Sequence, residues 1–127
     1  MKTEQVAARL VELCRAGKFD QAQRELYADD AVSIEPDGLP PGSLGNVKGL
    51  AAIQEKSAKF HDSVETFHGV SCSDAVVAAD WFSVALAVDA TFKGMGRIDM
   101  REICVYRVRG GKIVHEQFFY DVEPPSA

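Results

Sequence analysis

Hydrophobic and polar residues alternate most regularly near the end of the chain, between residues 97 and 121. The segment RIDMREICVYRVR carries an apolar residue at almost every second position, and a second alternating segment, KIVHEQFFYD, follows it. A period of two is the pattern of a half-buried strand. Gly110 and Gly111 between the segments supply the positive φ that a tight reversal requires. The sequence therefore predicts a long β-hairpin over residues 97–121.

Helical periodicity marks three earlier segments. Apolar residues three or four positions apart predict a helix over residues 3–16, with Thr3 as its N-cap and Gly17 as the residue that ends it. Further helices are predicted over residues 19–27 and 50–60 by the same criterion.

Extended segments are predicted over residues 31–35, 64–72 and 75–92, the first of them ended by Pro36. Residues 37–47 contain two prolines and three glycines. This segment is either a pocket rim or lid, or a mobile loop.

Helices first and antiparallel strands later are the order of an α+β domain. We expect one domain over residues 1–127, with a curved, mostly antiparallel sheet wrapped around the N-terminal helices. Such a sheet forms a cone with an internal pocket. Both faces of strand 82–92 carry apolar residues, which predicts a homodimer through the convex face of the sheet.

Composition and charge narrow the class of protein. The 127 residues are 46% hydrophobic and 26% charged, with a net charge of −5, so nucleic acid and anionic membrane surfaces are disfavoured as partners. The chain has neither a signal-peptide pattern nor an apolar run long enough to span a membrane. Three widely spaced cysteines suggest reduced thiols in the cytoplasm, and the absence of CxxC or HxxxH pairs argues against a metal site.

Three segments resemble the nuclear transport factor 2-like superfamily, and within it the SnoaL-like polyketide cyclases. They are LYADDAVSIEP (26–36), GLAAI (49–53) and VYRVRGGKIV...FFYD (105–121). The resemblance covers nearly the whole chain and implies a curved sheet, a deep apolar pocket and frequent homodimers. Members of the superfamily include aldol-type cyclases, ketosteroid isomerases, epoxide hydrolases, dehydratases and non-catalytic binding modules, so the fold alone does not settle function.

The resemblance also implies roles for individual residues. Asp121 falls where cyclases and epoxide hydrolases keep a catalytic aspartate, and Glu35 falls where ketosteroid isomerases keep their general base. Asp89 matches the second aspartate of the epoxide hydrolases, but Ala87 replaces their arginine. The two oxyanion donors of the isomerases are also replaced, by Leu10 and Cys104. These departures disfavour both of those reactions.

Local chemistry adds further candidates. Asp121 shares a strand face with His115, Gln117 and Phe119. If that face lines the pocket, burial would raise the pKa of Asp121 so that it serves as acid and base, with His115 as a proton shuttle. The alternative is an exposed aspartate at the strand end and a structural histidine.

Glu102 interrupts an otherwise apolar strand face. Because a buried carboxylate is costly unless it is paired or protonated, Glu102 is a second pocket acid, a partner of His115 across the hairpin, or an edge residue that reaches water. Cys104 is interpreted as a small core residue of the pocket wall rather than a nucleophile.

Three other residues each have two interpretations. Trp81 and Tyr106 either line the pocket or only pack in the core. Asp89 either faces the pocket or, as the hydrophobicity of the strand favours, points outward.

Two functions follow from these observations. The first is a cofactor-free cyclase, isomerase or lyase that acts on a small apolar carbonyl compound, in which Asp121 moves a proton next to the carbonyl and His115, Gln117 or Tyr106 positions the oxygen. The second is a non-catalytic ligand-binding or dimerisation module.

Overall fold

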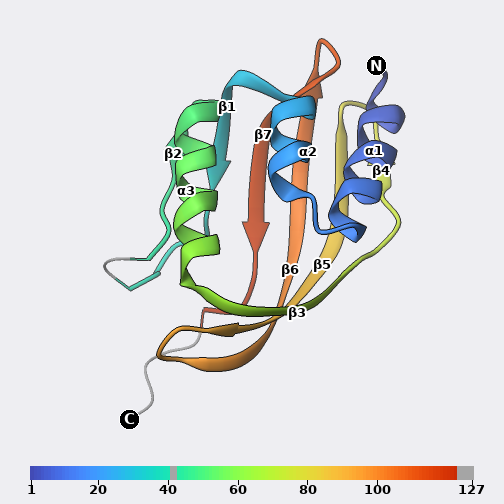
Figure 1. The fold of residues 1–127 in the computed structure, drawn as a ribbon. Helices are drawn as coiled ribbons and strands as arrows, with labels where there is room; N and C mark the ends of the chain where they lie inside the picture. Colours follow the sequence, from blue (N-terminus) through green and yellow to red (C-terminus); the bar gives the residue numbers. More distant parts are fainter. Residues whose placement is uncertain (41–42, 123–127) are drawn as a thin grey trace.

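The computed structural model describes residues 1–40 and 43–122. Three helices, α1 (Thr3–Arg15), α2 (Phe19–Leu26) and α3 (Leu50–Ser63), lie against one face of a sheet (Figure 1). The N-cap of α1 is Lys2 rather than the predicted Thr3, and its backbone N–H donates to Gln5 Oε1 at 2.8 Å. Gly17, at φ 71°, follows the last turn of α1 as predicted and allows the sharp corner into α2.

The sheet has seven strands in a mixed, mostly antiparallel arrangement. Strand order is β2-β1-β7-β6-β5-β3, with β4 added beside β5; β1 and β7 run parallel to each other, and the other strand pairs in this order are antiparallel. The long strands β5 and β6 curve beneath the helices (Figure 1). The α+β prediction is therefore confirmed. The strand bounds are β1 (Tyr27–Ile34), β2 (Val47–Lys48), β3 (Val64–Cys72), β4 (Val76–Ala78), β5 (Trp81–Phe92), β6 (Gly96–Arg109) and β7 (Lys112–Phe119).

Strand β1 starts earlier than predicted. Tyr27 is already paired with Ile113 of β7, so the chain passes from α2 into the sheet without a separate turn. The exposed Asp29 and Asp30 lie where the register between β1 and β7 shifts. An irregular, solvent-facing stretch of strand tolerates these two carboxylates because they remain hydrated.

The predicted hairpin is confirmed. β6 and β7 are joined by Gly110 at φ 59° and Gly111 at φ 77°, the two positive angles of a type I′ reversal. A side chain at Gly111 would also collide with the backbone of Met1, because a Cβ there would lie 2.8 Å from its nitrogen. Glycine is therefore needed at this position for both conformation and space.

The helices pack their apolar faces on the concave side of the sheet. Val6, Leu10, Leu26 and Ile53 of the helical layer are almost fully buried against strand residues such as Phe82. Along β5, alternate residues from Phe82 to Phe92 face this core, as the period of two predicts. No helix in the described part of the chain combines the length and apolar character needed to cross a membrane.

Candidate functional site

A cavity of about 230 Å³ lies between the helices and the concave face of the sheet. Apolar and aromatic residues form most of its lining, as is usual for a small-molecule site, and eight polar residues complete it. The apolar and aromatic lining residues are Leu10, Phe19, Ala22, Tyr27, Leu44, Phe60, Leu86, Val88, Met100, Tyr106, Phe118 and Tyr120. The polar ones are Cys14, Gln23, Glu35, Lys56, Ser57, His61, Glu102 and Glu116.

Lys56 of α3 reaches into this cavity and is buried. Its ammonium group donates to Ser33 Oγ at 2.7 Å, to the carbonyl oxygen of Gly45 at 3.2 Å and to Glu35 Oε1 at 3.3 Å. These three bonds use all three donors of the ammonium group. A buried ion pair is tolerated only when hydrogen bonds replace the lost water in this way. Lys56 therefore fixes one acidic corner of the cavity and has no donor left for a ligand.

Glu35 is the partner of Lys56 and lies between the end of β1 and Pro36. Its backbone N–H donates to Asn46 Oδ1 at 2.7 Å, and the Tyr120 hydroxyl donates to Glu35 Oε2 at 3.2 Å. Burial, together with the neighbouring Glu35 carboxylate, raises the pKa of Tyr120, which keeps its hydroxyl protonated. Both carboxylate oxygens of Glu35 therefore already accept hydrogen bonds.

Glu116 of β7 is the most deeply buried carboxyl group of the cavity, with 3% of its surface exposed. The Tyr27 hydroxyl donates a hydrogen bond to it. Burial raises the pKa of Glu116, and the hydrogen bonds from Tyr27 and Ser33 offset part of that rise. Sequence reasoning missed this residue and also missed Lys56.

Glu102 of β6 points from the concave face into the cavity. Burial raises the pKa of Glu102 to about 7, and the nearby charges of Glu35 and Glu116 add to the rise. Two groups act in the opposite direction, the Cys104 thiol by hydrogen bonding and Lys56 by its charge. The Cys104 thiol, at 3.5 Å, is the one hydrogen-bond donor to this carboxyl group among residues 1–40 and 43–122. Glu102 thus combines a cavity position with a carboxyl group that exchanges its proton near neutral pH.

Two other predicted pocket residues lie on the same face of β6. Tyr106 lines the cavity and stacks on Phe82, with 4.8 Å between the ring centroids. Cys104 is fully buried beneath the cavity wall. Burial raises the pKa of the Cys104 thiol above its usual range, which disfavours the nucleophilic thiolate.

His115 and the strand face that it shares with Gln117 and Phe119 do not line the cavity. Pairing of Glu116 with Tyr106 turns Glu116 inward and therefore turns its neighbours His115 and Gln117 to the convex face. There the His115 ring packs edge-on against Trp81 at 5.8 Å, and His115 Nε2 lies 3.2 Å from Gln117 Oε1. Phe119, 50% exposed, continues this convex row.

Asp121 also lies away from the cavity. β7 ends at Phe119, and Asp121 follows two residues later with an exposed side chain. The proposed pairing of Glu102 with His115 fails for the same geometric reason, because the two side chains project from opposite faces of the sheet and His115 is opposite Arg107. A catalytic role of Asp121 or His115 stays a prediction, and the positions of the two side chains outside the cavity do not favour it.

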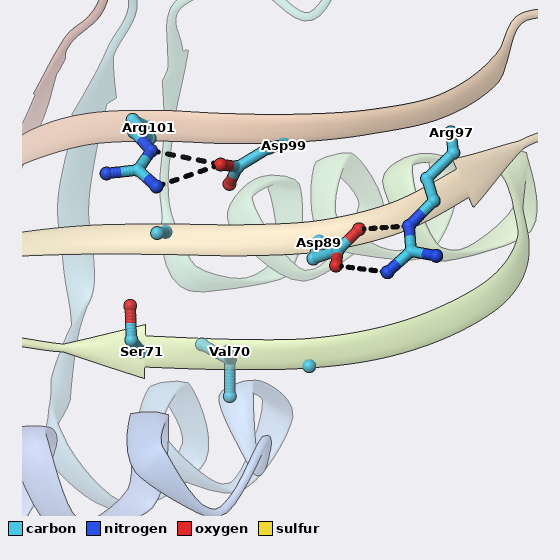
Figure 2. A pocket seen from close by; sticks show the side chains of 8 residues that line it. Val70, Ser71, Asp89, Arg97, Asp99 and Arg101 are labelled. Carbon is cyan, nitrogen blue, oxygen red and sulfur yellow. Dashed lines mark hydrogen bonds and ion pairs between the residues drawn. The ribbon is translucent and has the colours of Figure 1, made fainter.

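A second, open hollow of about 490 Å³ lies on the convex face and contains Asp89 (Figure 2). Arg97 forms two hydrogen bonds with Asp89, at 2.9 and 2.7 Å, and Arg101 pairs with Asp99 at 3.0 Å. The bond from Arg97 lowers the pKa of Asp89. Asp89 thus points outward, and its carboxylate is held as half of a surface ion pair.

The described residues contain no group of three or more His, Cys, Asp or Glu side chains placed to hold a metal ion. The polar lining of the cavity supplies carboxyl, phenol, imidazole, thiol, hydroxyl, amide and ammonium groups.

Comparison with known proteins identifies the family. The profile of the SnoaL-like domain matches residues 1–120. The chain belongs to the SnoaL-like family. A candidate SnoaL-like polyketide cyclase from Mesorhizobium loti is 31% identical, with a TM-score of 0.86 over 94% of this chain and 100% of that chain.

More distant structures share the SnoaL-like fold. A candidate isomerase from Bacillus subtilis is 20% identical, with a TM-score of 0.76 over 95% of this chain and 90% of that chain. A protein from Catenulispora acidiphila with a ketosteroid isomerase-like fold, solved with trimethylamine, is 18% identical, with a TM-score of 0.70 over 92% and 85%. No protein of curated function matches the chain.

Proposed function

We propose that this SnoaL-like protein binds a small, largely apolar carbonyl compound in the cavity and acts on it as a cofactor-free cyclase, isomerase or lyase. Glu102 is the group that exchanges a proton with the substrate. The observation that carries the proposal is that this carboxyl group faces an apolar cavity with a pKa of about 7. Other carboxyl groups of the cavity are already engaged, Glu35 by Lys56 and Glu116 by Tyr27.

A carboxyl group with this pKa is suited to acid–base catalysis. Near neutral pH its acid and base forms are both populated, which is the condition for efficient proton transfer in either direction. The Glu102 carboxylate takes a proton from the carbon next to the carbonyl group, and the resulting carboxylic acid returns the proton to the rearranged product. The Tyr106 hydroxyl group in the same lining supplies a donor for the carbonyl oxygen, whereas the Tyr120 hydroxyl group already donates to Glu35.

The size of the cavity limits the substrate. At about 230 Å³ it lies below the ~300–1,000 Å³ typical of drug-sized ligand sites. A compound with one ring, or two small ones, fits this volume better than a steroid or a multi-ring polyketide. The candidate cyclase and isomerase among the relatives support the reaction class, and the cavity argues for a smaller substrate.

A second candidate function is binding without chemistry. The Glu102 carboxyl group and the aromatic lining would also hold a small cation, because carboxylates and aromatic faces both attract ammonium groups. The relative from Catenulispora acidiphila that was solved with trimethylamine favours this alternative.

Hydrogen–deuterium exchange at carbon distinguishes the two functions. Small aromatic and cyclic ketones are incubated with the protein in D₂O, and deuterium at the carbon next to the carbonyl is followed by NMR. We expect catalysed exchange in the wild type and a loss of about 10²–10⁴-fold in Glu102→Gln. Asp121→Asn is the matched control and should retain the exchange. Exchange that persists in Glu102→Gln contradicts the proposal, and binding without exchange in the wild type supports the binding module.

A further inference from the structure

The two oxygens of the Glu102 carboxyl group have different surroundings. Oε1 accepts the hydrogen bond from the Cys104 thiol at 3.5 Å. Oε2 has no hydrogen-bond partner among residues 1–40 and 43–122, and it is not one of the described side-chain atoms that are buried without a partner. Oε2 is therefore open to the cavity that Glu102 lines. The protein anchors one oxygen of this carboxyl group and leaves the other for a ligand.

Cys104 is a rigid anchor for Oε1. It lies two residues after Glu102 on the concave face of β6 and has no exposed surface. Its neighbours across the sheet are Val84 of β5 and Phe118 of β7. Close packing holds the sulfur atom of such a residue in one place, and full burial keeps it from touching a ligand. An effect of Cys104 on the reaction therefore acts through Glu102.

A buried thiol has two properties that suit this position. Burial raises the pKa of the Cys104 thiol above its usual range, so the sulfur keeps its hydrogen at the pH values at which Glu102 titrates. The S–H group is also a weak donor. A strong hydrogen bond to a carboxylate lowers the pKa of that carboxyl group, whereas a weak one lowers it little. A thiol can thus orient Glu102 and still leave it a base near neutral pH.

We propose that Cys104 is a positioning residue for proton transfer by Glu102. Its thiol holds Oε1, so that Oε2 faces the substrate carbon next to the carbonyl group. Oε2 takes the proton from this carbon, the electron pair of the C–H bond moves into the enolate, and Oε2 returns the proton to the product. The thiol hydrogen stays on sulfur throughout. The inference rests on the proposed function, in which Glu102 is the acid–base group.

Other titratable groups face Glu102, and the variants below leave all of them unchanged. They come from several elements: Glu35 after β1, Glu116 on β7, Tyr120 after β7 and Lys56 on α3. The residue opposite Glu102 on β5 is the apolar Leu86. The remaining titratable groups of the cavity lining are Cys14, Tyr27, His61 and Tyr106. A difference between variants at residue 104 therefore reports the contact between this residue and Glu102.

Two substitutions of Cys104 separate its role as a donor from its packing. Cys104→Val removes the donor and keeps the side chain close to its original size, so the pKa of Glu102 should rise. Cys104→Ser introduces a stronger donor, so the pKa of Glu102 should fall. We expect the midpoint of a carbon NMR titration of the Glu102 carboxyl group to move by about half to one pH unit, in opposite directions in the two variants. Cys72→Val, which changes a buried cysteine of β3 outside the cavity lining, should leave the midpoint unchanged.

The pH profile of carbon exchange tests the positioning itself. If basicity alone mattered, Cys104→Val would raise the rate that is reached at high pH, because its carboxylate is the stronger base. Loss of orientation acts in the opposite direction, and we expect this limiting rate to fall about tenfold. Cys104→Ser keeps a donor and should stay within about threefold of the wild-type limiting rate. Its lowered midpoint also decides the inference if Cys104→Val does not fold.

Three results would overturn the role of Cys104. They are a midpoint that does not rise in Cys104→Val, a midpoint that does not fall in Cys104→Ser, and a limiting rate in Cys104→Val that equals or exceeds that of the wild type. An equal displacement of the midpoint in Cys72→Val would also overturn it, because the effect would then belong to the core in general.

The proposed function fails separately from this inference. Exchange that persists in Glu102→Gln refutes Glu102 as the proton carrier, whereas the carboxyl titration still shows whether Cys104 bonds Glu102. Unchanged midpoints in both variants of Cys104, with intact and Glu102-dependent exchange, would refute only the role of Cys104.

Discussion

The Lys56 ammonium group lies 3.3 Å from Glu35 Oε1 inside the cavity, and both side chains are more than nine-tenths buried. The same ammonium group bonds Ser33 and the backbone of Gly45. This pair therefore joins α3, β1 and the segment that precedes β2 around one corner of the site.

Lys56→Met is expected to lower the free energy of unfolding by about 3–5 kcal/mol, because it leaves the Glu35 carboxylate buried without its counter-ion. The double variant Lys56→Met/Glu35→Gln should recover a large part of the loss, since no buried charge remains. Urea unfolding measures both, with the exposed Lys59→Met on the same helix as control. A loss below about 1 kcal/mol in the single variant would show that the pair is not buried as described.

Glu102 makes stability depend on pH. Its pKa is raised from 4.5 to about 7 in the folded state. The folded state therefore holds this proton more tightly than the unfolded state does, and stability falls as pH rises from about 4.5 to 7. Below pH 4.5 the free energy of unfolding is not reduced by Glu102. Above pH 7 the reduction is complete, on the order of 3 kcal/mol.

Glu102→Gln should remove this pH-dependent cost. We expect the variant to gain stability relative to the wild type at pH 8 and to differ little from it at pH 4.5. Urea unfolding at the two pH values is the measurement, with Glu65→Gln on the exposed side of β3 as control. A difference between variant and wild type that is the same at both pH values would contradict the assigned pKa.

The hydrogen bond from Tyr27 to Glu116 gives a prediction about the deepest part of the site. Tyr27→Phe removes the donor and leaves a buried carboxyl group less satisfied, so we expect a loss of about 1–3 kcal/mol in unfolding free energy. In the double variant with Glu116→Leu the additional cost of the tyrosine change should be much smaller. Additive effects of the two changes would mean that the hydroxyl group does not bond this carboxyl.

The homodimer inferred from the sequence stays a prediction. The exposed apolar residues of the convex face indicate which surface would form the interface. Trp81, Ile103 and Phe119 are 40%, 47% and 50% exposed there. We expect light scattering to give a dimer at micromolar concentration and Ile103→Lys to give a monomer, because an interface excludes unpaired charges from its core. Met95→Lys, in the exposed β5–β6 turn, should remain dimeric. A monomeric wild type would refute the dimer.

Much of the fold could be predicted from the sequence because its signals are local. The alternation along β6 and the Gly110-Gly111 pair specify a hairpin without reference to the rest of the chain. Strand β2, with only two residues, carries no periodicity and was missed. The early start of β1 was missed because Tyr27 gains its strand partner, Ile113, from a segment 86 residues away in sequence.

The site was less predictable because alternation defines two faces of a strand without saying which one is inward. On β7 both faces carry aromatic residues, and the parallel pairing with β1 decides that Glu116 and Phe118 face the helices. Lys56 did have a local signal, since it lies three residues after the buried Ile53 and four before Phe60 on one helical stripe. A lysine in an apolar stripe indicates a buried partner, and that partner is Glu35.

The most direct test of the central claim is a carbon NMR titration of the Glu102 side-chain carboxyl group from pH 4 to 9, with and without a bound ketone. The signal is assigned by its absence in Glu102→Gln. We predict a titration step near pH 7 in the free protein and a shift of that step when the ketone binds. A step near pH 4.5 that no ketone displaces would contradict the account, because Glu102 would then be an ordinary solvated carboxylate outside the site.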